Sequence, residues 1–170
     1  MGCDIHLYVE YKTIDRDYWY GFGERINPGR NYALFGLMSD GVRTSYPESF
    51  KAKGLPDKLG FASESDSKLY ICEDGADGHA SLEDAWRWHK AGSSKIIFQD
   101  EQPTWVTHPD WHSHSWLTAD EFTQVIKNYN EIAKEEGYRF NEPEWEAVDI
   151  LLQHFKSEGF DSRIVFWFDN

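Results

Sequence analysis

Histidines are concentrated in one part of this sequence, where their spacing could bind a metal ion. Five of the seven fall between His79 and His114. If the chain is extended there, His112 and His114 point to the same side of it, as two imidazole ligands of a transition metal would. Asp77 and His79 add a carboxylate and a third imidazole on a turn. Three such ligands and a water would bind zinc or manganese and generate a hydroxide nucleophile.

Two interpretations without a metal remain open for the same histidines. In the first, the imidazoles hydrogen-bond loop backbone in a segment that also holds tryptophans and needs amphipathic rings to fill space. In the second, they transfer protons or hydrogen-bond a ligand. The spacing nevertheless predicts a metal site formed by Asp77, His79, His112 and His114.

Asp4 and His6 are candidate catalytic residues. Residues 3–11 alternate between apolar and polar side chains, which predicts a strand with Asp4, His6 and Tyr8 on its polar face. Asp4 could orient His6 as a general base. Two residues apart along a strand, however, their side chains stand about 6 to 7 Å from each other, which is long for a hydrogen bond. We therefore expect catalysis only if this face meets the histidine cluster.

Two arginines bracket a predicted first helix at residues 32–39, which Asn31 would cap. Arg30, Asn31, Tyr32 and Arg43 are the candidate ligand-binding residues, because guanidinium groups can clamp a phosphate or carboxylate in a bidentate manner. The alternative is that each arginine forms a surface salt bridge, worth about 0 to 1 kcal/mol.

The elements that would position these residues predict an α+β or α/β fold. The expected architecture is a single mixed sheet with the first and last strands in its centre, helices packed on one or both faces, and a long ordered loop over residues 42–68. The remaining expected strands are 18–22, 69–72, 95–99 and 163–168. The remaining helices are 82–91, 118–137, where Thr118 and Glu121 would form a capping box, and 143–157, with Pro143 in its first turn. Residues 103–116 are expected to be irregular. The length predicts a single domain over residues 1–170.

Composition limits the classes of partner. The net charge is −13, from 30 acidic and 17 basic residues, which disfavours binding to nucleic acid. Two cysteines, no signal peptide and no apolar run of membrane-spanning length predict a cytoplasmic protein without membrane attachment.

Short motifs in order along nearly the whole chain resemble a family of uncharacterised proteins carried by tailed bacteriophages and prophages. They are Met-Gly-Cys-Asp-Ile-His at 1–6, Arg-Asn-Tyr at 30–32 with Leu-Phe at 34–35, Gly-Val-Arg at 41–43, Gly-Leu-Pro at 54–56, Asp-Gly-His at 77–79, His-Ser-His-Ser-Trp-Leu at 112–117 and Phe-Trp-Phe-Asp-Asn at 166–170. The chain departs from that family between residues 11 and 27 and in the acidic, serine-rich 63–67. The resemblance implies a phage-encoded protein in the host cytosol, and it implies no particular reaction.

Three functions follow as hypotheses. The first is a phage accessory protein whose pocket binds a small anionic or nucleotide-like ligand, extending to metal-dependent hydrolysis. The second keeps the pocket without turnover, so that the protein sequesters a host signalling nucleotide. The third is an acidic inhibitor or mimic that binds a host protein. The expected pocket residues of the first two are Asp4, His6, Arg30, Arg43, His79, His112 and His114.

Overall fold

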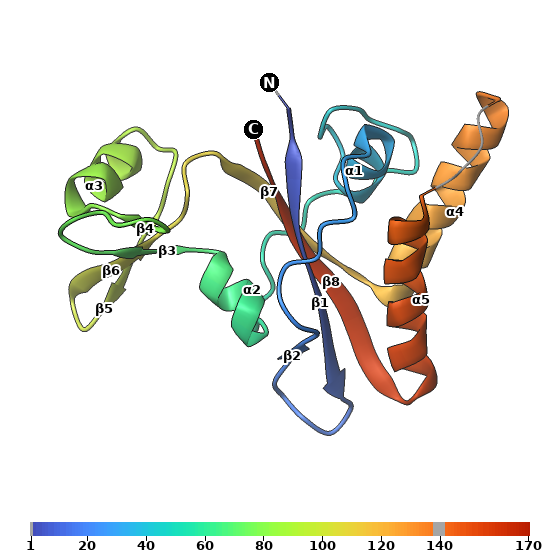
Figure 1. The fold of residues 1–170 in the computed structure, drawn as a ribbon, viewed down its shortest axis with the longest axis horizontal. Helices are drawn as coiled ribbons and strands as arrows, with labels where there is room; N and C mark the ends of the chain where they lie inside the picture. Colours follow the sequence, from blue (N-terminus) through green and yellow to red (C-terminus); the bar gives the residue numbers. More distant parts are fainter. Residues whose placement is uncertain (1, 138–141) are drawn as a thin grey trace.

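The computed structural model describes residues 2–137 and 142–170 and has an α+β fold, as the sequence predicts. Figure 1 shows its two sheets and the helices around them. The elements are β1 (Asp4–Thr13), β2 (Tyr20–Gly21), α1 (Tyr32–Met38), α2 (Phe61–Asp66), β3 (Leu69–Ile71), β4 (His79–Ala80), α3 (Leu82–Lys90), β5 (Ile96–Gln99), β6 (Gln102–Val106), β7 (Trp111–Thr118), α4 (Ala119–Glu135), α5 (Pro143–Ser157) and β8 (Phe160–Asp169).

The first sheet has the strand order β2-β1-β8-β7 and is antiparallel throughout. β1 and β8 pair along their full length, from Asp4 opposite Asp169 to Thr13 opposite Phe160. Both strands carry apolar side chains on the face toward the core, so burial fixes their register. The prediction that the first and last strands are central is confirmed.

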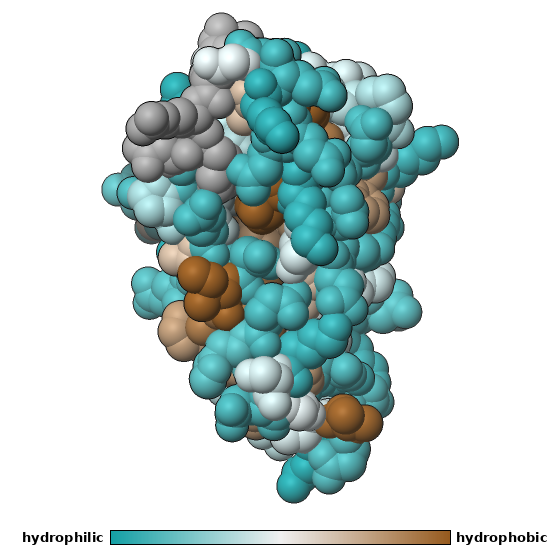
Figure 2. Space-filling model, turned by 90° about the vertical axis from the view of Figure 1, so that its right-hand side faces the viewer, coloured by the Kyte–Doolittle hydropathy of each residue, from teal (hydrophilic) through white to brown (hydrophobic). Residues whose placement is uncertain are grey.

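One face of this sheet forms the main hydrophobic core with α1, α4 and α5. Leu7 of β1, Phe35 of α1, Phe122 of α4, Trp145 of α5 and Phe166 of β8 are all fully buried there. The predicted capping box at Thr118 is present and begins α4. The outer faces of α4 and α5, on the side shown in Figure 2, are mostly hydrophilic, as amphipathic helices require. Within the described ranges, every helix is too short or too polar to cross a bilayer.

A second sheet, with the order β4-β3-β6-β5, replaces the single sheet that the sequence analysis expected. It packs with α3 around a small core of Ala80, Ala85 and Val106. The difference arises in residues 103–116, which were expected to be irregular but are mostly in strands, with only 107–110 between them. β6 ends at Val106 in the second sheet, and β7 begins at Trp111 in the first, so this aromatic segment is divided between the two sheets.

The opposite face of the first sheet is covered in part by residues 55–62 of the excursion that was expected over residues 42–68. This segment contains a short helix, α2, that the sequence pattern did not predict. Beneath it lies a buried ion pair in which Arg163 donates to Glu10 over 2.8 Å. The backbone N–H of Gly60 donates to Glu10 over 2.6 Å, and the hydroxyl of Ser63 donates to the same carboxylate. Buried charge is thus paired and hydrogen-bonded, and it ties the excursion to the sheet.

Candidate functional site

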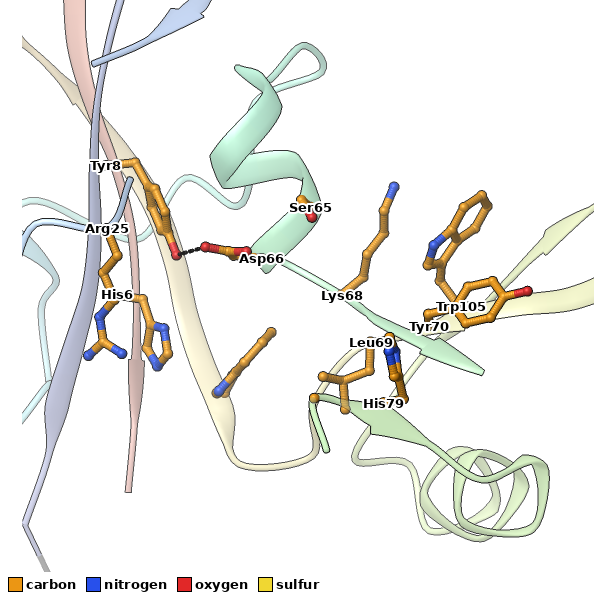
Figure 3. A pocket seen from close by; sticks show the side chains of 12 residues that line it. His6, Tyr8, Arg25, Ser65, Asp66, Lys68, Leu69, Tyr70, His79 and Trp105 are labelled. Atoms are coloured by element: carbon orange, nitrogen blue, oxygen red, sulfur yellow. Dashed lines mark hydrogen bonds between the residues drawn. The ribbon is translucent and has the colours of Figure 1, made fainter. Parts of the chain in front are cut away.

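A cleft of about 410 Å³ lies between the first sheet and the second. Figure 3 shows side chains from β1 on one side of it and side chains from β3, β4 and β6 on the other, with the end of α2 above. A cavity of this size is within the range of small-molecule sites. Its lining residues are His6, Tyr8, Arg25, Ser65, Asp66, Lys68, Leu69, Tyr70, Gly78, His79, Trp105 and Trp111.

The wall formed by β1 presents His6 and Tyr8, two side chains of its predicted polar face. The hydroxyl of Tyr8 donates to the carboxylate of Asp66, at the end of α2, over 2.9 Å. Burial, and then this hydrogen bond, raise the pKa of Tyr8. The phenol therefore stays protonated and keeps one oxygen of Asp66 occupied.

His6 is held on several sides. Its Nε2 lies 2.8 Å from a carboxylate oxygen of Asp169, at the end of β8. Its ring stacks on Trp167, with centroids 5.4 Å apart, and lies 5.2 Å from the ring of Trp111. Burial lowers the pKa of His6, and the hydrogen bond to Asp169 opposes that shift without cancelling it. The ring is therefore fixed in orientation and neutral at pH 7.

Two cations line the cleft. Arg25 donates to the backbone carbonyl of Ile5 over 2.7 Å. Because the carbonyl is neutral, this contact does not neutralise the positive charge of Arg25. Lys68 lies over the ring of Trp105, with the ammonium 4.7 Å from the centroid, and 3.3 Å from a carboxylate oxygen of Glu64.

The wall formed by the second sheet is largely aromatic. Tyr70 of β3 and His79 of β4 meet edge to face, with centroids 5.8 Å apart. Trp105 of β6 pairs with Tyr70 across the strands and also lines the cleft. Flat ligands bind to such walls because their rings can stack on aromatic side chains.

Of the two predicted catalytic residues, only His6 lies in the cleft. Asp4 accepts two hydrogen bonds from Arg30, over 2.5 and 2.7 Å, and these lower its pKa. Asp4 and Arg30 line a separate surface depression together with Asp169. The acid that orients His6 is therefore Asp169, which β1–β8 pairing places opposite Asp4.

The other predicted ligand-binding residues make structural contacts outside the cleft. Asn31 caps α1 by accepting from the N–H of Leu34, and its amide donates to Tyr129 over 2.9 Å. The guanidinium of Arg43 lies 5.4 Å from the ring centroid of Tyr32 and donates to Asn170 over 3.0 Å. The structure thus does not bring the expected arginine clamp to His6.

The predicted metal site is not formed. The pairing of β7 with β8 shifts register between His112 and Ser115, and Ser113 has a φ of 51°. His112 consequently stacks on Phe168 while His114 stacks on Trp167. Because these neighbours on β8 point to opposite faces of the sheet, the two histidines do too. His79 and Asp77 belong to the β4 region of the second sheet, and no group of three His, Cys, Asp or Glu among the described residues could hold a metal ion.

Several residues of the cleft were missed by the sequence analysis. Arg25, Asp66 and Lys68 belong to segments without a periodic pattern, so nothing in the sequence indicated where they would point. Tyr70 lies in a strand that was expected, but the three residues of that strand do not show which face lines a cleft. The sequence does contain a signal for Asp169, because this residue follows an apolar strand that was expected to pair with the strand of His6.

Comparison of the chain with protein-family models, with curated proteins and with solved structures finds no match. The geometry and the charges of the cleft are therefore the features of this chain that point to a function.

Proposed function

We propose that this protein binds a small nucleotide-like anion, with a flat ring and a phosphate, in the cleft between its two sheets. The observation that carries the proposal is a local reversal of charge. The chain has a net charge of −13, yet the cleft is lined by two cations, Arg25 and Lys68, against a single carboxylate. That carboxylate, on Asp66, already accepts a hydrogen bond from Tyr8.

The two halves of such a ligand have matching surfaces in the cleft. The phosphate would be bound by Arg25 and Lys68, since guanidinium and ammonium groups are the usual partners of phosphate oxygens. The ring would stack on the aromatic wall formed by Tyr70 and Trp105. The surrounding negative surface would repel longer polyanions, so we propose a mononucleotide or dinucleotide rather than a nucleic acid.

The resemblance to phage proteins suggests where such binding would act. A phage-encoded protein with this cleft would meet its ligand in the host cytosol. Sequestration of a host signalling nucleotide is the simplest form of the proposed function, because it needs binding alone.

Isothermal titration calorimetry with AMP, ATP, cyclic mononucleotides and cyclic dinucleotides tests the proposal. We expect one nucleotide to bind per chain, and Arg25→Gln to weaken that binding by about 10-fold or more, since a hydrogen bond to a charged group contributes about 1.5 to 3 kcal/mol. Arg16→Gln is the matched control, because Arg16 is exposed, lies outside the cleft and bonds Tyr18. Equal affinity in both variants, or no binding of any nucleotide by the wild type, would contradict the proposal.

A further inference from the structure

The contact between His6 and Asp169 determines which ring nitrogen can act as a base. An ionised carboxylate only accepts hydrogen bonds, so the ring proton lies on Nε2, which is 2.8 Å from the Asp169 oxygen. The lone pair is then on Nδ1. This nitrogen makes no hydrogen bond to any residue within the described ranges.

The position of the ring suits proton transfer inside the cleft. His6 lines the cleft and Asp169 does not, so the hydrogen bond from Nε2 to Asp169 holds the ring at the edge of the cavity. Trp111 and Trp167 restrict rotation of the ring. Burial keeps the imidazole in its neutral, basic form at pH 7. A base that is oriented by an acid and fixed by packing is the arrangement that general-base catalysis needs.

We propose that the cleft hydrolyses a nucleotide phosphodiester, with His6 as the general base and Asp169 as the residue that positions it. This inference depends on the proposed function, because the same cations must bind the phosphate. Arg25 and Lys68 would stabilise the negative charge that increases on the phosphate oxygens during attack.

The reaction balances without a further reagent. Nδ1 of His6 removes a proton from a water molecule as the water oxygen bonds to phosphorus. The bond between phosphorus and the leaving alcohol oxygen breaks on the opposite side, that oxygen takes a proton from water, and the imidazolium returns its proton to water. The products are a phosphomonoester and an alcohol, and His6 returns to its neutral form with the Nε2 proton still donated to Asp169.

The test uses the full chain with three probes: bis(para-nitrophenyl) phosphate, 2′,3′-cyclic AMP and 3′,5′-cyclic AMP. We expect hydrolysis of at least one probe by the wild type. His6→Gln should lower kcat by about 100-fold or more, since general acid–base catalysis contributes about 10² to 10⁴-fold. His154→Gln is the control, because His154 is an exposed histidine on α5, outside the cleft. Circular dichroism at 222 nm establishes that each variant is folded.

Asp169→Asn separates positioning from support of the fold. An asparagine amide can donate to Nε2, which would move the ring proton to Nδ1 and remove the base. We expect kcat to fall at least about 10-fold with KM unchanged. The pH at which the remaining activity is lost in acid should move down, because the Asp169 hydrogen bond raises the pKa of His6 and would be absent. A variant with weakened packing alone would not shift that profile.

The possible outcomes distinguish this inference from the proposed function. Hydrolysis that His6→Gln abolishes while nucleotide binding persists would support both. Nucleotide binding without hydrolysis of any probe, or full activity in His6→Gln, would overturn the catalytic inference and leave the binding function intact. Failure of the wild type both to bind nucleotides and to hydrolyse the probes would overturn both.

Discussion

Protonation of His114 should destabilise the fold as the pH falls. Its Nε2 is buried without a hydrogen-bond partner, and its ring stacks on the fully buried Trp167 with centroids 5.6 Å apart. Burial, and then the nearby His112, lower the pKa of His114 from 6.5 to about 4. In the unfolded chain the same imidazole would titrate at its ordinary value of about 6.5.

The sign and size of the effect follow from this difference. Between pH 6.5 and pH 4 the unfolded chain binds more protons than the folded chain, so stability falls as the pH falls through that window. Above pH 6.5 and below about pH 4 the contribution of His114 is constant. The full difference corresponds to about 3 kcal/mol, and about 2 kcal/mol of it should be lost by pH 5.

His114→Phe isolates this contribution. The phenyl ring can keep the stacking on Trp167 but cannot be protonated. The free energy of unfolding would be measured by urea titration at pH 7.5, 6 and 5, followed by circular dichroism at 222 nm. We expect the wild type to lose about 2 kcal/mol more than the variant between pH 7.5 and pH 5. His154→Gln, on the exposed side of α5, controls for the loss of a histidine.

If the free energy of unfolding fell by the same amount in the wild type and in His114→Phe between pH 7.5 and pH 5, the reasoning would be refuted, because another group would then cause the pH dependence. At pH 7.5 the variant should be at least as stable as the wild type, since it removes a buried nitrogen that has no partner.

Three further predictions concern the fold, and urea titration at pH 7.5 checks each. Glu10→Gln should cost about 3 to 5 kcal/mol, because it leaves the charge of Arg163 buried without its partner, and a loss below 1 kcal/mol would contradict that. Thr118→Ala should cost about 1 kcal/mol through loss of the α4 cap, whereas Thr118→Ser should restore it. Gly36→Ala should cost about 1 to 3 kcal/mol, because the new methyl group would lie 2.7 Å from the carbonyl oxygen of Thr44, and unchanged stability would show that this segment moves freely.

The parts of the fold with a regular pattern could be predicted. The alternation in β1, the capping box at Thr118 and Pro143 in the first turn of α5 each gave the correct element. These signals are local, since burial of one face or satisfaction of one helix end is sufficient to produce them.

Two strands of the second sheet, β3 and β5, were predicted at 69–72 and 95–99, but their separation from the first sheet was not, because the strands of this sheet are two to five residues long and β3 is paired with a strand distant in sequence. The residues predicted to form a metal site lie apart for a related reason. A single residue, Ser113, takes a left-handed conformation and turns His112 and His114 to opposite faces. No spacing rule for an extended strand includes such a bulge.

Of the expected pocket residues, the cleft contains His6, from a regular strand, and His79, from a predicted turn. His6 and Tyr8 were placed on the polar face of β1, and both line the cleft. The partner of His6 comes from β8, so identifying it required the strand register as well as the strands. Lys68 and Tyr70 follow α2, a helix too short to leave a hydrophobic period in the sequence.

The pairing of β1 with β8 has a consequence for how the chain folds during synthesis. The two strands pair along their full length, and the register joins Asp4 to Asp169 across almost the entire sequence. A topology of such high contact order folds slowly. On the ribosome, β1 emerges long before β8, so the backbone edge of β1 that β8 occupies in the fold stays unpaired while the residues between them are synthesised. We therefore expect nascent chains that end before β8 to depend on chaperones to remain soluble.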